Sequence, residues 1–274
     1  NNIKLIGRSF KYHRPRGIIS HGSEEPNGLV EVINDHYNEP NTKITIIELY
    51  EGLKAKSQNC WPSVKYDLMS INNKLSNFIP AGFYYKTFMW PSSFWEKIYE
   101  PLIRKAAGLG SLSLSNSSRN SEKGFLHCDF LIIGSGPSGL VSAYIAGLSG
   151  ARVILVEEDF VFGGSLNNET FTISDMPAQD WIKFILKQLN ELTNVRLMKR
   201  TEIIGMFDHG IFAAIEKNKY KKIDQIFWKI TTKTTLLCSG STERLIPFQN
   251  NDLPGIMLSN SIRSYANRWG VKSF

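Results

Sequence analysis

The sequence contains few cysteines, and they lie far apart. Cys60, Cys128 and Cys238 form no C-x-x-C pair and have no histidine at the spacing typical of a metal site. We interpret them as buried or free thiols in a reducing compartment, which predicts a cytoplasmic location. The five histidines are also scattered. No residue has the spacing of a nucleophile, a general base or a metal ligand, so neither a catalytic residue nor a metal site is predicted in this chain.

A long apolar run is also missing. No window reaches eighteen uninterrupted apolar residues, so we expect neither a transmembrane helix nor a membrane partner. The N-terminal residues show no initiator methionine and no signal-peptide pattern, yet they already have strand character, and we therefore expect a fragment of a longer protein. A hydrophobic content of 42% and a charged content of 21% are those of a soluble globular protein, and 274 residues favour two domains.

The net charge of +7 comes with only one dense basic cluster. This cluster comprises Arg8, Lys11, His13, Arg14 and Arg16, and the other basic residues are spread along the chain. No nucleic-acid-binding module can be recognised around the cluster, so no nucleic-acid partner is predicted. We interpret the cluster as non-specific charge or as part of a subunit interface.

The most informative stretch is 128–158, CDFLIIGSGPSGLVSAYIAGLSGARVILVEE. It predicts a strand at 130–133, a glycine turn, a helix and a second strand at 153–156. In the turn, Gly134 allows a sharp bend, Gly136 allows the backbone to approach a pyrophosphate, and Gly139 allows the helix to pack closely on the strand. The helix is expected to carry Leu140, Tyr144, Ile145 and Leu148 on one face.

An acidic residue follows this unit at the position that a dinucleotide requires. Glu157 lies 18 residues after Gly139, at the end of the second strand, where its carboxylate can accept hydrogen bonds from ribose hydroxyls. A carboxylate favours NAD or FAD over NADP, whose 2′-phosphate it would repel. The sequence therefore predicts a Rossmann-like α/β dinucleotide-binding domain. The weaker alternative is a glycine turn in an ordinary α/β unit.

Three later positions are candidates for the same site. Gly163, Gly164 and Ser165 form a loop that would close over the cofactor, although a plain turn is an equal alternative for this loop alone. Ile203 falls where a strand would lie beside an adenine ring, and Gly240 ends an apolar strand at 234–240 close to the cofactor phosphates. Further strands are expected at 195–198, 202–207, 211–215 and 225–230, and a helix is expected after Asp175 and Pro177.

The first half of the chain predicts a smaller domain and a connector. Strand-like runs at 3–6, 28–33 and 43–49 indicate an α+β or β-rich domain. The stretch 81–110 is dense in aromatic residues; we favour packing against a domain or subunit over a ligand-binding role, and Pro101 should end or kink its helix. The serine-rich stretch 111–124 is typical of a flexible linker. The predicted domains are 1–80, 81–124 and 125–274.

Several long motifs resemble one family. They are, in chain order, GRSFKYHRPRGI, EEPNGLVEV, AGFYYKTFMWP, YEPLIRKAAGLG, GSGPSGL, GGSL and FQNNDLPGIMLSNSIRSYANRWGV. Together they are similar to the alpha subunit of heterotetrameric sarcosine oxidase over nearly the whole chain. The resemblance implies that 1–80 is a partial ferredoxin-like domain, that 125–274 is an incomplete FAD/NAD-binding domain, and that the chain is truncated at both ends.

The resemblance also implies an activity and a set of partners. The family oxidises sarcosine to glycine, passes the methyl carbon to tetrahydrofolate and reduces oxygen to hydrogen peroxide. NAD would lie in this chain, FMN at a subunit interface and FAD in the beta subunit, and the complex would include beta, gamma and delta subunits. The NAD contacts carried over from the family would be Gly134, Gly136, Ser138, Gly139, Glu157, Glu158, Asp159, Ser165 and the vicinity of Ile203.

Two departures from the family pattern stand out. Asp159 replaces a residue that is often basic or an amide, and a third negative charge beside the phosphates would weaken binding. Related subunits hold a [2Fe–2S] cluster with four cysteines, whereas residues 1–80 contain only Cys60, so no cluster is expected in this chain unless residues missing from it supply ligands. Two alternatives remain open: a catalytic FAD-dependent amino-acid or opine dehydrogenase subunit, and a scaffold with a purely structural nucleotide.

Overall fold

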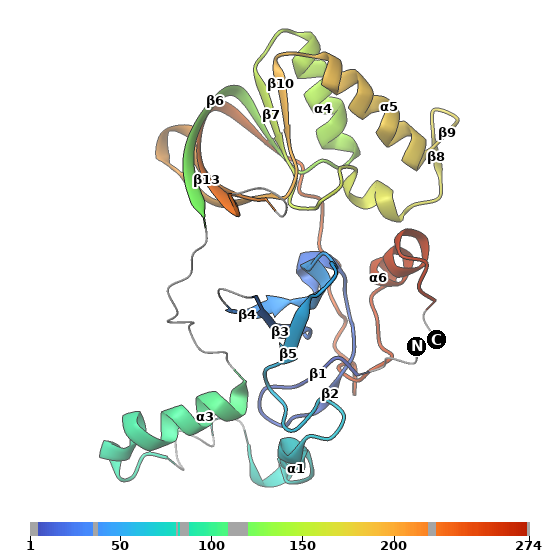
Figure 1. Ribbon diagram of the computed structural model, residues 1–274. Coiled ribbons are helices and arrows are strands. Elements are labelled where there is room, and N and C mark those ends of the chain that lie inside the picture. Colours follow the sequence, from blue (N-terminus) through green and yellow to red (C-terminus); the bar gives the residue numbers. More distant parts are fainter. Residues whose placement is uncertain are drawn as a thin grey trace. The chain divides into compact units, whose positions relative to one another are not determined.

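The computed structural model describes residues 5–34, 38–80, 82, 88–108, 120–218 and 223–272. The chain forms two compact units, which are treated separately below (Figure 1). The first unit comprises residues 1–118 with 243–262, and the second comprises 119–242 with 263–273. The three-part division expected from composition stays a prediction, and most of the expected linker lies outside the described residues.

A small antiparallel sheet is the centre of the first unit. Strand β3 (Leu29–Ile33) pairs with β4 (Asn38–Lys43) on one side and β5 (Lys54–Ser57) on the other. A hairpin of β1 (Gly7–Arg8) and β2 (Pro15–Arg16) precedes this sheet in the sequence. Short helical turns lie between and after these strands: η1 (Gly22–Glu24), η2 (Ile44–Ile46), η3 (Leu68–Ser70), α1 (Ile71–Lys74), η4 (Ser76–Phe78) and η5 (Ser92–Phe94).

The prediction of a strand at 43–49 is wrong. Strand β4 ends at Lys43, and the following isoleucines form the turn η2. The Ile44 amide donates to the Gly28 carbonyl at 2.8 Å, and a Cβ on Gly28 would lie 2.5 Å from the Ile44 side chain. The apolar run therefore packs across Gly28 instead of extending the sheet. Part of the run expected at 3–6 lies outside the described residues, and β1 begins only at Gly7.

Arginines of the basic cluster near the N-terminus form ion pairs and hydrogen bonds within the first unit. Arg14 donates to Asp252 at 2.9 Å, and Arg16 approaches the same carboxylate at 2.7 Å. Arg8 donates to backbone carbonyls, among them that of Val64 at 3.0 Å. Because the side chains in these pairs are partly buried, the charges hold distant segments of one unit together, and this accounts for much of the dense positive charge.

The aromatic-rich stretch continues into a helix that Pro101 does not interrupt. A π-helical turn, η6 (Trp95–Tyr99), runs directly into α3 (Glu100–Ala107). Proline is tolerated in the first turn of a helix, where its missing N–H costs nothing, and Pro101 lies at the start of α3. The expectation that Pro101 ends the helix near Glu100 is therefore wrong, and the alternative of a kink at this point stays a prediction. Gly108, at φ 65°, ends α3 in the left-handed conformation. Phe94 and Leu102 are exposed.

The second unit is built on one mixed sheet, with strand order β10-β7-β6-β13-β12-β11. The first four strands of that order run parallel to their neighbours, and β12 and β11 continue antiparallel. Its strands are β6 (Ser121–Ile133), β7 (Val153–Val156), β10 (Val195–Met198), β11 (Thr201–Phe207), β12 (Ile211–Lys217) and β13 (Gln225–Leu237). The predicted α/β class is confirmed.

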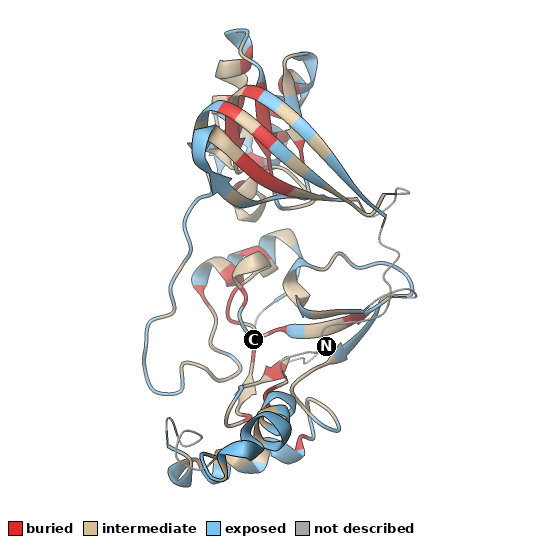
Figure 2. Ribbon diagram, turned by 90° about the vertical axis from the view of Figure 1, so that its left-hand side faces the viewer, coloured by how far each residue is buried: buried red, intermediate tan, exposed pale blue. Residues whose placement is uncertain are grey.

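The core of this unit lies on both faces of the parallel strands, which Figure 2 shows as a band of buried residues. Strand β7 is buried along its whole length. Its residues Val153 and Leu155 pack with the helices, whereas Ile154 and Val156 pack with residues of β12 and β13. This alternation explains the continuous apolar sequence of the strand, since a parallel strand covered on both faces has no polar side.

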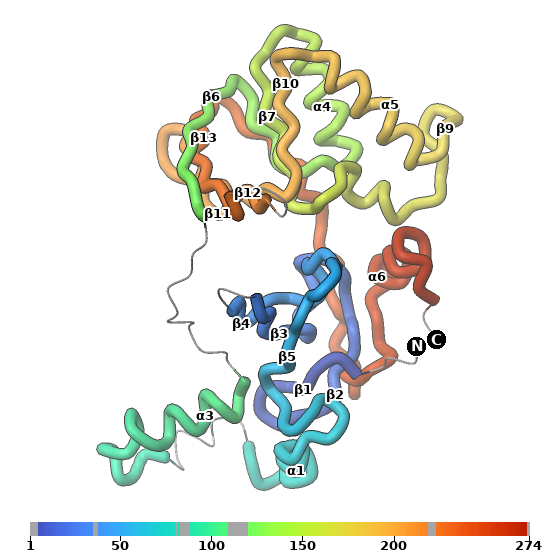
Figure 3. Tube along the Cα trace, viewed as in Figure 1, coloured from blue at the N-terminus to red at the C-terminus, as the bar shows by residue number. Residues whose placement is uncertain are grey.

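Helices α4 (Pro137–Leu148) and α5 (Ala178–Glu191) cover the same face of the sheet, as Figures 1 and 3 show. In α5, Ile185 and Leu189 are both buried against the sheet. In α4 the expected apolar face is confirmed for Leu140, which is buried, and for Tyr144, which packs against the same core. It is wrong for Ile145 and Leu148, which are mostly exposed, whereas Ala143 is buried. The small residues of α4 face the strands because the glycine turn brings this helix close to them.

Two boundaries differ from the sequence expectation. The runs at 225–230 and 234–240 form the single strand β13, which ends at Leu237. The threonine-rich segment between them continues the ladder because β-branched residues suit an extended backbone. Residues 121–124, expected as linker, are the first residues of β6 and pair with the start of β13. Short elements β8 (Thr172–Ile173) and β9 (Met176–Pro177) precede α5.

Candidate dinucleotide-binding site

The glycine turn between β6 and α4 contains glycines of two kinds. Gly134 has φ 100°, and a Cβ there would lie 2.4 Å from the carbonyl oxygen of Cys238. A Cβ on Gly139 would lie 1.9 Å from the carbonyl oxygen of Gly134. These two glycines are required by the fold itself. Gly136 differs, because a Cβ there would meet no described atom of the chain within 4 Å.

This difference is the fit test for a dinucleotide. Packing inside the chain does not require a glycine at position 136, whereas a pyrophosphate lying against the backbone does. Gly136 is also the N-cap of α4, so the first free N–H groups of a helix begin beside this open space. Ser138 lies in the first turn of α4 and is exposed. The residues of the turn therefore fit a bound phosphate group.

Glu157, the acidic residue predicted to bind the ribose, accepts hydrogen bonds on both of its carboxylate oxygens. Its side chain is buried, with 8% of the residue exposed. The Ser135 amide and hydroxyl donate to its Oε2 at 2.9 and 2.5 Å, and the Asp159 amide donates to Oε1 at 3.0 Å. A carboxylate has about four acceptor positions, so the chain uses three of them. Glu157 thus retains room for about one ribose hydroxyl rather than two.

The two acids after Glu157 differ in environment. Glu158 is exposed. Asp159 forms a bidentate ion pair with Arg268, whose Nη1 and Nη2 lie 2.6 and 3.0 Å from the two carboxylate oxygens. The Phe160 amide also donates to the Asp159 carboxylate at 2.7 Å. The negative charge that the sequence analysis noted as unfavourable is therefore compensated within the chain.

The loop at 163–165 lies directly against the glycine turn. The Gly163 amide is 3.1 Å from both the carbonyl and the hydroxyl oxygen of Ser135. A Cβ on Gly164, which has φ 51°, would lie 2.9 Å from the Cα of Gly136. Ser165 is exposed within the turn η7 (Gly164–Asn168). The structure thus brings Gly164 and Gly136 together, and closure of this loop over a cofactor stays a prediction.

Two further candidates for the site, Gly240 and Ile203, have different surroundings. The Cys238 amide donates to the Ile133 carbonyl at 2.7 Å, which brings the segment leading to Gly240 beside the turn. Gly240 has φ 73° and no described atom near its Cβ position. Ile203 packs instead against the core formed by β6, β7 and β12. The residue bonded to Glu157 from this part of the chain is Thr201, whose amide donates to the Glu157 carbonyl at 2.8 Å. The cofactor contacts of Ile203 and Gly240 stay predictions.

Sequence reasoning missed Ser135 and Arg268. Ser135 is fully buried and links Glu157 to Gly163, although it stands at a variable position of the G-x-G-x-x-G pattern. Its burial is known only from the structure, so no sequence signal marked this serine. Arg268 lies 109 residues from its partner Asp159, and nothing in the sequence spacing indicates this pair.

The thiol of Cys238, which lies near the glycine turn, is not an activated nucleophile. Burial raises the pKa of Cys238, so at neutral pH its side chain is protonated. Among the described residues there is also no group of three or more His, Cys, Asp or Glu side chains arranged to hold a metal ion.

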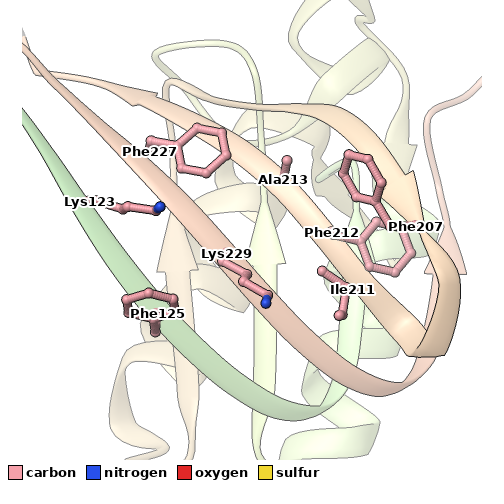
Figure 4. A pocket seen from close by; sticks show the side chains of 8 residues that line it. All are labelled: Lys123, Phe125, Phe207, Ile211, Phe212, Ala213, Phe227 and Lys229. Carbon is pink, nitrogen blue, oxygen red and sulfur yellow. The ribbon is translucent and has the colours of Figure 1, made fainter.

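Two hollows occur elsewhere on the second unit. A groove of about 390 Å³ lies across β6, β13, β12 and β11, with Phe125, Phe207 and Phe227 along its walls and Lys123 and Lys229 beside them (Figure 4). It is not lined by any predicted cofactor residue. A second hollow of about 750 Å³ lies beside the 160–170 loop. Phe160 and Arg268 contribute to its lining, which places it next to the Asp159 ion pair.

None of the helices that the structure describes combines the length and the apolar character needed to span a membrane.

Two family models match parts of the chain. Residues 129–234 match the family described as FAD dependent oxidoreductase, and residues 1–60 match that described as 2Fe-2S iron-sulfur cluster binding domain. Residues 1–60 do not supply the ligands of such a cluster, because Cys60 is the sole cysteine in this range and a [2Fe–2S] cluster needs four ligands. The residues present do not fit that cluster.

Relatives and a solved structure match over the full chain. The sarcosine oxidase subunit alpha of Rhizobium meliloti (strain 1021) is 47% identical over 99% of this chain and 28% of its own length. The same subunit of Corynebacterium sp. (strain U-96) is 30% identical over 100% of this chain and 25% of its own length. The crystal structure of L-proline dehydrogenase from P. horikoshii covers 100% of this chain and 42% of its own, with a TM-score of 0.61 at 18% identity, and so shares the fold.

The motifs and these comparisons agree. The fold expected from the sequence, a ferredoxin-like region followed by an FAD/NAD-binding domain, is confirmed by the two family matches. The chain spans about a quarter of the length of the curated relatives that it matches. It belongs with the sarcosine oxidase alpha subunits, and corresponds to part of one.

Proposed function

We propose that this chain is the dinucleotide-binding part of an alpha-type subunit in a sarcosine oxidase complex, a cytoplasmic oxidoreductase. The complex would oxidise sarcosine to glycine, pass the methyl carbon to tetrahydrofolate and reduce oxygen to hydrogen peroxide. The observation that carries the proposal is 47% identity to a sarcosine oxidase alpha subunit along 99% of the chain. The open space over Gly136 supports the cofactor-binding part of the proposal.

The proposed role of the chain is to bind NAD and not to perform the chemistry. Gly136 and the N-terminal turn of α4 would receive the pyrophosphate, Glu157 would accept a ribose hydroxyl, and Gly164 would close the loop over it. Glu158, Ser138, Ser165, Ile203 and Gly240 complete the proposed set of contacts. When bound, a nicotinamide dinucleotide supplies hydride transfer. FMN at a subunit interface, FAD in the beta subunit, and gamma and delta subunits belong to the same proposal.

A second candidate is a catalytic flavoprotein in which FAD occupies the same turn. The match of residues 129–234 to an FAD-dependent oxidoreductase family favours it. The carboxylate of Glu157 suits the ribose of FAD as well as that of NAD, because neither carries a 2′-phosphate. This candidate would be an amino-acid or opine dehydrogenase subunit. A scaffold whose nucleotide is purely structural is a third, weaker candidate; it predicts a cofactor that neither borohydride nor substrate reduces.

The test is to identify the nucleotide in the full-length subunit, co-expressed with its neighbouring subunits. The purified subunit is denatured, and the released nucleotide is identified by absorbance and mass. NAD from this subunit, together with flavin elsewhere in the complex, is the expected result. FAD from this subunit would move the chemistry into this chain and favour the second candidate. Release of no dinucleotide would contradict both.

A further inference from the structure

Three consecutive acids stand at the end of β7, where the phosphates of a dinucleotide would have to lie nearby. Glu157 is neutralised in part by the hydrogen bonds that it accepts from Ser135 and from the Asp159 amide. Asp159 follows two residues later and would add a further negative charge. Unpaired, this charge would repel a pyrophosphate at the distances within one binding site.

Arg268 removes this charge with a fixed geometry. Its two terminal nitrogens bind the two oxygens of Asp159 in a bidentate pair, and only 17% of its side chain is exposed. The guanidinium also lies 5.2 Å from the ring centre of Phe160 and 4.7 Å from that of Trp269. A guanidinium held by a carboxylate and two aromatic rings has little freedom to leave its place.

The segment 263–269, to which Arg268 belongs, also contacts the C-terminal end of the loop 159–169. Arg263 lies 3.0 Å from the carboxylate of Glu169, and the Asn267 amide side chain donates to the Asn168 carbonyl at 2.7 Å. The segment 263–269 therefore holds the loop 159–169 at both ends. Gly163 and Gly164, which lie against the glycine turn, are in the middle of this loop.

We propose that Arg268 is a positioning residue for the dinucleotide. It cancels the charge of Asp159 and fixes the start of the loop that carries Gly163 and Gly164, so that cofactor retention depends on a residue 109 positions beyond Asp159 in the sequence. This inference rests on the proposed dinucleotide-binding function. It adds a specific mechanism, charge compensation through Asp159, which is tested separately from binding itself.

The test is a double-mutant cycle in the full-length subunit within its complex. Arg268→Ala, Asp159→Asn and the double variant are stripped of nucleotide, and the Kd for NAD⁺ is measured by calorimetry. If NAD⁺ does not bind the wild type, FAD is the probe. Arg268→Ala should weaken binding roughly tenfold, because it leaves an uncompensated carboxylate beside the phosphates. The double variant should recover most of that loss, because no charge remains to be compensated.

The matched control is Arg152→Ala, which breaks another Arg–Asp pair, with Asp129 beside the opposite end of β7. This variant should leave the Kd within about twofold. Thermal unfolding of each variant shows whether it is folded, and Arg268→Lys provides a milder change that keeps the charge and should bind more tightly than Arg268→Ala. Raising the salt concentration should reduce the penalty of Arg268→Ala, since added ions screen the exposed charge of Asp159.

The outcomes separate the two levels of the proposal. An unchanged Kd in Arg268→Ala overturns the role of Arg268 and leaves the proposed function intact. Equal weakening in Arg268→Ala and in the double variant also overturns it, because the effect would then come from packing alone. A wild-type subunit that binds neither NAD⁺ nor FAD overturns the proposed function itself, and this inference with it.

Discussion

The hydroxyl of Ser135 donates a hydrogen bond of 2.5 Å to the carboxylate of Glu157. The same hydroxyl oxygen accepts the amide of Gly163 at 3.1 Å. One buried side chain therefore links the glycine turn, the end of β7 and the loop that follows. The contact aims the Glu157 carboxylate and sets the position of the loop, so the predicted nucleotide site is shaped before any nucleotide binds.

Replacing Ser135 by alanine should loosen this junction. The variant removes the hydrogen bond from a buried hydroxyl to the Glu157 carboxylate, and a hydrogen bond to a charged group contributes about 1.5–3 kcal/mol to the free energy of unfolding. The Gly163 amide keeps the Ser135 carbonyl as its acceptor. Chemical denaturation of the full-length protein measures this difference. Ser149→Ala is the control, because its hydroxyl makes only a local bond at the exposed end of α4. Equal stability of the two variants would contradict the linking role.

Replacing Glu157 by arginine should strongly reduce cofactor retention. A cation would stand where ribose hydroxyls need an acceptor, and the Ser135 amide would lose its partner, so occupancy should fall roughly tenfold or more. The released nucleotide per subunit is quantified by absorbance after denaturation. Glu191→Arg makes the same charge change at the exposed end of α5 and should retain the nucleotide. Unchanged occupancy in Glu157→Arg would remove this residue from the site.

Acid should destabilise the protein partly through Asp129. Hydrogen bonds from Arg152 and Lys233 hold the pKa of this carboxyl well below its usual range. A carboxyl whose pKa is lower in the folded than in the unfolded state stabilises the fold above its unfolded pKa, and this contribution is lost as the pH falls below about 4. Thermal unfolding between pH 7 and pH 3 should show a smaller acid-dependent loss in Asp129→Asn. An identical pH profile would argue against the contribution.

In the first unit, His13 should be important for stability. Its Nδ1 lies 2.6 Å from the carboxylate of Asp67, its Nε2 lies 3.0 Å from the Ala106 carbonyl, and both side chains are nearly inaccessible. Removing one partner of a buried pair typically costs about 3–5 kcal/mol, so His13→Ala should markedly lower the denaturation midpoint. His127→Ala, on an exposed position of β6, should change it little. A midpoint shift no larger than that of this control would contradict the prediction.

Sequence reasoning predicted the second unit much better than the first. The strand at 153–156 and that at 195–198 are observed with the expected bounds, because a short apolar run between turn signals has few alternatives in a parallel sheet. In the first unit the run at 43–49 has the same apolar character. It forms a turn across Gly28 instead, because the strand pairing was already supplied by the residues before it.

Local sequence alone determined the strand, glycine turn, helix and second strand around Gly134, Gly136 and Gly139. These features depend on backbone conformations and periodicities that neighbouring residues encode. Only the tertiary structure decided that Ser135 orients Glu157 and that Arg268 compensates Asp159. The partners in these pairs lie 22 and 109 residues apart. Such contacts exist only after the sheet and the segment 263–269 have come together, so no local pattern specifies them.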